Sequence, residues 1–160
     1  MTTKSNAKIE SEKLHLFAVK VFKACLDTEE HFRDNPKKVT EYLINTASDT
    51  SFSISEKRCR FRLFFKFSAI DEERNPVGLE AEFGIEFHFI IDNIEDFLIH
   101  KVDDEVFIDS QLGVTLCGIS YSTARGIIIE KMQGTYFDGV ILPIVSPAKL
   151  LEDQRKVTKG

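Results

Sequence analysis

The chain has 160 residues, with 21 Lys and Arg against 26 Asp and Glu, which gives a formal net charge of −5 at pH 7. This length favours one domain, and the acidic balance argues against nucleic acid or an anionic membrane surface as the main partner. We find no hydrophobic signal core and no apolar run near the ~20 residues of a membrane span, so we expect a cytoplasmic protein without membrane insertion.

Residues 1–12 are polar and predict a flexible N-terminus, followed by a single domain over residues 13–154 and a polar tail over residues 155–160. Residues 13–26 predict a long first strand that is apolar on both faces. One face carries Phe17, Val19, Val21 and Cys25, and the other carries Leu14, Leu16, Ala18, Phe22 and Leu26. Such a strand needs cover on both sides, which indicates an interface between subunits.

A charged loop with at most one helical turn is expected over residues 27–38, and a weaker second strand over residues 39–54. Residues 58–91 then predict a long antiparallel hairpin, because apolar and polar residues alternate with period two on both sides of a charged turn that ends at Pro76. Opposite charges suggest a register that pairs Lys66 with Glu80 and Arg60 with Glu86.

Residues 92–109 are acidic with scattered apolar pairs, and we expect an irregular crossover there. Helical spacing from about residue 110 to 133 predicts a long helix that ends before Gly134. The three consecutive residues Ile127, Ile128 and Ile129 span about 200° of its surface, more than one sheet can cover. After an apolar linker, Ser146 and Pro147 predict the start of a short final helix.

The predicted fold class is α+β: a four-stranded antiparallel sheet followed by a long helix and a short C-terminal helix. None of the four histidines has a nucleophile or ligand spacing near it, so we predict no catalytic residue, metal site or cofactor. The three cysteines, Cys25, Cys59 and Cys117, predict buried free thiols. Glycines within the long helix predict close packing of another backbone.

Several motifs follow one another in an order that resembles the SecB chaperone family. The long helix carries Tyr121 and the pair Ala124-Arg125, Gly134-Thr135 follows it, the linker contains Leu142-Pro143, and a short helix begins at Pro147. Residues 45–48 (NTAS) are also similar to a second-strand motif of that family, and the resemblance covers roughly residues 14–151.

The resemblance implies an ATP-independent chaperone that binds unfolded or precursor polypeptides in hydrophobic grooves and assembles as a homotetramer, a dimer of dimers. The matching client-binding residues are Phe97, Leu98, Val102, Phe107, Tyr42, Ile44, Leu150 and Leu151. The residues expected at or near subunit contacts are Val19, Val21, Cys117, Tyr121, Ala124 and Ile128. Glu80 is a candidate contact for the SecA motor.

Two departures from the family bear on its partners. The Cys-Pro interruption that many export-type members have near the tyrosine is absent, and so is an acidic C-terminal tail. SecA and an antitoxin are therefore both candidate partners. Two other classes are considered: a hotdog-type thioesterase, in which the helix comes before most strands, and a carrier of small hydrophobic ligands, which predicts a monomer with a closed cavity.

Overall fold

The computed structural model describes residues 7–100 and 103–157, and the side chains up to residue 152. Val102, the first six residues of the predicted flexible N-terminus and the end of the predicted tail lie outside the described residues. Four long antiparallel strands form the main sheet in the order β1-β4-β3-β2: β1 (Leu14–Thr28), β2 (Glu41–Ser53), β3 (Arg58–Ile70) and β4 (Pro76–Ile91). The predicted number and direction of the strands are confirmed.

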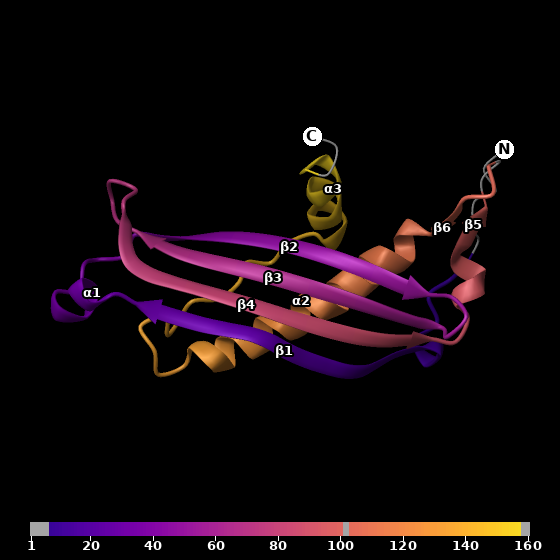
Figure 1. Cartoon of the computed structure of the whole chain (residues 1–160), viewed down its shortest axis with the longest axis horizontal. Coiled ribbons are helices and arrows are strands. Elements are labelled where there is room, and N and C mark those ends of the chain that lie inside the picture. The colour runs from indigo at the N-terminus through magenta and orange to yellow at the C-terminus, as the bar shows by residue number, and fades with distance from the viewer. Residues whose placement is uncertain (1–6, 101–102, 158–160) are drawn as a thin grey trace.

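One long helix, α2 (Ser110–Met132), runs obliquely across the strands (Figure 1). The Asp109 carboxylate caps its first turn by accepting a hydrogen bond from the Gln111 backbone N–H at 2.9 Å. Gly134, with φ of +72°, stands just beyond its end as predicted, because glycine adopts left-handed geometry without strain. A shorter helix, α3 (Pro147–Val157), completes the predicted α+β architecture, which is confirmed.

The remaining elements are short. Helix α1 (Glu30–Asp34) forms the single helical turn expected between β1 and β2, and the 3-10 turn η1 (Ser11–Lys13) precedes β1. The crossover is more regular than predicted, since it contains the 3-10 turn η2 (Ile94–Phe97) and a small hairpin of β5 (Leu98–His100) and β6 (Val106–Ile108). Its strands are too short to show a period in the sequence. The β5–β6 hairpin and α1 lie at opposite ends of the sheet (Figure 1).

The predicted register of the central hairpin is wrong by two residues along most of its length. Lys66 lies opposite Glu82 rather than Glu80, and Arg60 lies opposite His88 rather than Glu86. Next to the turn, Ile70 pairs with Pro76, as the predicted register requires, but a β-bulge beyond it inserts two extra residues into β4. A shift of two keeps every side chain on its predicted face.

Gly78 lies in this bulge with φ of +93°, a conformation that strains any residue with a side chain. The imidazole of His31 on α1 covers it so closely that a Cβ there would lie 2.9 Å from His31 Cε1. The bulge therefore depends on packing by a segment more than forty positions away in the sequence, which the local pattern does not reveal.

Strand β1 contains two further irregularities, at Phe17 and at Phe22, each of which adds one residue relative to β4. The strict alternation expected for this strand is therefore wrong. Leu16, Val19 and Val21 lie opposite inward-facing residues of β4, while the Phe17 ring packs near His88 on the other face, with ring centroids 5.8 Å apart. The strand is apolar and exposed on both faces, as predicted, and each of those three aliphatic residues is 38% exposed.

The predicted subunit contacts on the long helix need correction. Cys117, Tyr121, Ala124 and Ile128 face the sheet within one chain and are at most 5% exposed, and the Tyr121 ring lies 6.0 Å from that of Phe65. Because the sheet already covers their surface, no second subunit is needed to bury them. The predictions for Val19 and Val21 stay open, since both are exposed on the edge strand β1.

Helix α2 also corrects the expectation about apolar runs. By length and composition alone it could cross a membrane, with a mean hydropathy of 1.3 over an 18-residue window. In the structure one face of α2 packs on the sheet, and 39% of that window is buried. Among the cysteines, Cys59 and Cys117 are buried as predicted, but Cys25 is exposed, because it points from β1 to the face without a helix.

Candidate functional site

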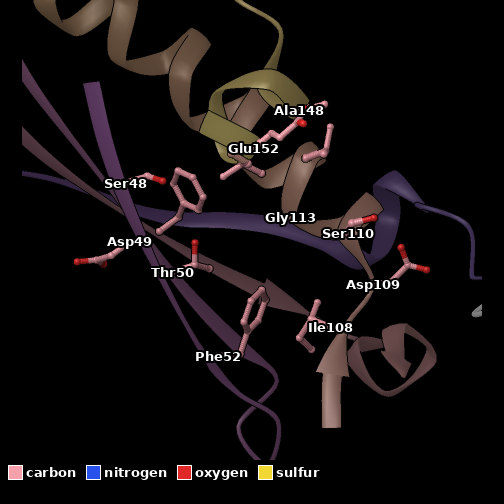
Figure 2. A pocket seen from close by; sticks show the side chains of 13 residues that line it. Ser48, Asp49, Thr50, Phe52, Ile108, Asp109, Ser110, Gly113, Ala148 and Glu152 are labelled. Carbon is pink, nitrogen blue, oxygen red and sulfur yellow. The ribbon is translucent and has the colours of Figure 1, made fainter. Parts of the chain in front are cut away.

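A groove of about 680 Å³ lies between β2, the start of α2 and the short helix α3 (Figure 2). Apolar side chains from all these elements and from the end of β6 reach it. The residues that line it are Ser48, Asp49, Thr50, Phe52, Phe61, Ile108, Asp109, Ser110, Gly113, Val114, Ala148, Leu151 and Glu152. Figure 2 shows the labelled side chains of Phe52 and Ile108 near one another, with Ala148 and Glu152 on the opposite wall.

The floor of the groove follows from the composition of β2. The inward-facing positions of this strand change from Tyr42 and Ile44 to the small residues Ser48 and Thr50 before Phe52 follows. Small side chains do not fill the space under α3 as a run of large apolar residues would, so a hollow is left beside Phe61. The groove is thus built from an interruption in the apolar pattern.

Helix α3 and the residue that begins it pack near two glycines of α2. A Cβ on Gly118 would lie 3.4 Å from Pro147 Cγ, and one on Gly113 would lie 3.9 Å from Leu151 Cδ1. These are side-chain atoms at ordinary van der Waals distance, so the predicted close packing of another backbone against the glycines is not observed at either position. Gly126 differs, because a Cβ there would meet nothing within 4 Å in the described part of the chain.

The linker that leads into α3 is held by two side chains of α2. The Tyr121 hydroxyl donates a hydrogen bond to the Pro143 carbonyl at 2.8 Å, and Arg125 Nε donates one to the Leu142 carbonyl at 3.0 Å. Burial raises the pKa of Tyr121, which keeps the hydroxyl protonated and able to donate. Residues four apart on a helix share a face, so this spacing binds two successive carbonyl groups.

The structure brings together some of the predicted client-binding residues. Leu151 lines the groove, and Leu150 is half-buried beside it on α3. On the crossover, Phe107 is 41% exposed and adjoins Ile108, a lining residue that pairs with Leu98.

Other predicted residues lie elsewhere. Tyr42 and Ile44 are on the same face of β2 but nearer α1, and the Tyr42 ring lies 6.0 Å from that of Phe137. Phe97 is 1% exposed and belongs to the core, so a client cannot contact it in this conformation. Glu80 is exposed on the sheet face opposite the groove, where nothing tests its predicted role.

The sequence did not single out Phe52, Phe61, Ile108 or Val114 as groove residues. Phe52 lies an even number of residues after Tyr42 and Ile44 and therefore shares their strand face, and this spacing could have identified it. Ile108 lay within the predicted irregular crossover, and Val114 lay in the first turns of the predicted long helix, where no feature of the sequence set it apart. The groove is apolar at its base, with the carboxylates of Asp109 and Glu152 at its rim, and no histidine lines it. Such a surface suits noncovalent binding of apolar side chains.

No family model matches the sequence, and no curated protein matches it. Among solved structures, the chain superimposes on a SecB-like chaperone with a TM-score of 0.56 at 10% sequence identity, covering 85% of this chain and 93% of the other. That structure is the Mycobacterium tuberculosis Rv1957 SecB-like chaperone in complex with a ChAD peptide from the HigA1 antitoxin.

A second match is a protein of unknown function from Streptococcus agalactiae, with a TM-score of 0.40 at 12% identity, covering 82% of this chain and 97% of that one. Its similarity is too low to support an argument. The superposition on the chaperone shows a shared fold, and an identity of 10% does not establish a shared function.

Proposed function

We propose that this protein is an ATP-independent chaperone that binds non-native polypeptides in the groove beside α3. The observation that carries the proposal is an apolar groove with acidic residues at its rim, on a fold shared with a SecB-like chaperone. Apolar contact tolerates many client sequences, while rim carboxylates favour clients with basic residues. We propose that it acts in the cytoplasm and without catalysis.

The same comparison bears on the identity of the client. The chaperone with the similar fold was solved with a peptide from an antitoxin, which favours an antitoxin as the client of this chain over an export precursor destined for SecA. The absence of a Cys-Pro step near Tyr121 points the same way. A hotdog-type thioesterase is disfavoured because α2 follows all four long strands, and a closed-cavity carrier because the groove is open to solvent.

The test of client binding compares two double variants. We expect Ile108→Ser with Leu151→Ser to weaken the suppression of aggregation of an unfolded test protein at least severalfold. Each change removes apolar contact from the groove, where burial of one such side chain contributes roughly 1.5–3 kcal/mol. Binding at several sites dilutes the effect. Light scattering of the aggregating protein measures it.

The matched control is Ile141→Ser with Ile144→Ser. These two isoleucines are 55% and 87% exposed in the linker and do not line the groove, so their loss should leave chaperone activity unchanged. Circular dichroism of all variants establishes that the fold survives. Equal activity of the groove variant and the wild type, or an equal loss in the control, would show that the groove is not the client site.

We further propose a homotetramer, a dimer of dimers, that uses the exposed edge strand β1 and the open face of α2 around Gly126. A Cβ at Gly126 would meet nothing within 4 Å in the described chain, and leucine improves helix propensity by up to about 1 kcal/mol, so the protomer should stay folded. We expect Gly126→Leu to reduce the native mass from tetramer to dimer. A monomeric wild type, or an unchanged tetramer in the variant, would contradict the proposed contact.

A further inference from the structure

The sheet face turned away from α2 carries a cluster of basic side chains near the turn between β2 and β3. Arg60 on β3 lies opposite His88 on β4, and His88 in turn lies opposite Ala18 on β1. In the neighbouring row, Arg62 lies opposite Glu86, and Lys20 of β1 is the cross-strand neighbour of Glu86 on its other side, without an ion pair between them. Because side chains alternate along each strand, these residues point to the same side of the sheet.

Some of these groups are already paired. Arg62 donates to the Asp49 carboxylate through Nε at 2.8 Å, and His88 Nε2 lies 2.5 Å from a Glu86 carboxylate oxygen. Three exposed cations remain without a carboxylate partner among the described residues: Arg58, Arg60 and Lys20. Unpaired cations in a chain of net charge −5 leave a local positive surface.

An exposed aromatic ring lies within this cluster. The Arg58 guanidinium carbon is 5.4 Å from the centroid of the Phe17 ring, and Phe17 is 47% exposed. The irregularity of β1 at Phe17 places this ring on the basic face. We call Arg58, Arg60, Lys20 and Phe17 the basic-aromatic patch. It offers positive charge and an apolar surface side by side.

We propose that the basic-aromatic patch binds an extended acidic polypeptide segment of a partner protein, with carboxylates two residues apart. Arg58 and Arg60 are two positions apart on one strand, so their Cα atoms are about 7 Å apart. Alternate residues of an extended peptide have the same spacing. An acidic residue at every second position can therefore contact both arginines. An apolar residue of the same segment can pack on Phe17.

A polypeptide fits this patch better than nucleic acid does. Affinity for a polyphosphate grows with the number of phosphates neutralised, and the patch has three free cations. Glu86 and Asp49 lie beside it, so a longer polyanion would meet like charge on leaving the patch. The patch and the groove are on opposite faces of the sheet, which allows an acidic partner to bind while a client occupies the groove.

The test titrates the protein with the acetylated peptide Gly-Glu-Leu-Glu-Phe-Glu-Gly amide and follows backbone amide signals by NMR. We expect the largest shifts in residues 17–20, 58–62 and 88, and weaker binding as salt is added. Arg60→Glu with Lys20→Glu should weaken binding at least tenfold, and Arg60→Gln with Lys20→Gln at least threefold. Lys66→Glu, on the same face of the same strand, should change binding less than twofold. The peptide with glutamines in place of glutamates should not bind.

The proposal is overturned if the acidic peptide fails to bind at millimolar concentration, or if both Arg60 variants bind it as the wild type does. Tighter binding of a ten-nucleotide single-stranded DNA would assign the patch to nucleic acid instead. The groove variant Ile108→Ser with Leu151→Ser should bind the peptide normally. Loss of chaperone activity with retained peptide binding, or the reverse, thus separates the two proposals.

Discussion

Replacement of Ile128 by aspartate is expected to unfold the protein. Ile128 is 0% exposed, on the face of α2 that packs on the sheet. The loss of an isoleucine from a packed core costs about 2–5 kcal/mol, and burial of a carboxylate without a partner adds to that. A domain of this kind has about 5–15 kcal/mol of stability in total. Loss of the native circular dichroism signal and of a cooperative thermal transition would show the effect.

Two controls make this result specific. Ile128→Val removes one methylene group, costs about 0.5–1.5 kcal/mol and should leave a folded protein. Gly126→Leu, two residues away on α2, should also stay folded, because it changes an open position rather than the core. If Ile128→Asp gave a folded protein of lower mass, Ile128 would belong to a subunit interface after all.

The second large effect concerns thiol chemistry. At pH 8, Ellman's reagent should modify one thiol of the native protein, Cys25, at least about 100-fold faster than the other two. Cys25 is exposed, whereas burial raises the pKa of Cys59 to about 12 and that of Cys117 to about 11. About one buried Cys59 thiol in ten thousand is then ionised at pH 8, and the thiolate is the reactive form.

The control variant Cys25→Ser should show no fast reaction, and all three wild-type thiols should react together in denaturant. Because burial favours the neutral thiols, their contribution to the free energy of unfolding should be fully present below about pH 9. It should be lost as the pH rises from about 9 to 12. Two rapidly reacting thiols in the native wild type would show that α2 opens from the sheet.

The sequence predicted which side of each central strand is buried, because alternation alone decides it. It did not predict the pairing of Lys66 with Glu82, because the bulge at Gly78 depends on His31 packing over it. Similarly, Phe22 fits over Gly84, where any Cβ would overlap its ring. Such shifts arise from contacts between distant segments, and a local pattern does not contain them.

The candidate site was predictable in part for a similar reason. Leu151 and the neighbourhood of Phe107 were found because the resemblance to SecB proteins identified the final helix and the crossover as client-binding elements. Ser48 and Thr50 were not found, because a groove floor is marked by the absence of large side chains. The apolar width of α2 has a partial explanation within the chain: the sheet, the linker and α3 pack on it, and a subunit contact on its remaining face is part of the proposed assembly.

The two irregularities of β1 bear on the proposed chaperone function, because a chaperone has to avoid edge-strand pairing with the unfolded chains that it binds. An edge strand with a regular row of free backbone groups is a template on which an unfolded segment can add as a new strand. At Phe17 and Phe22 the extra residues break that row into three short regular stretches, residues 14–16, 18–21 and 23–28. A regular incoming strand therefore cannot pair along the whole edge. Only a strand with matching irregularities, such as β1 of another copy, could do so.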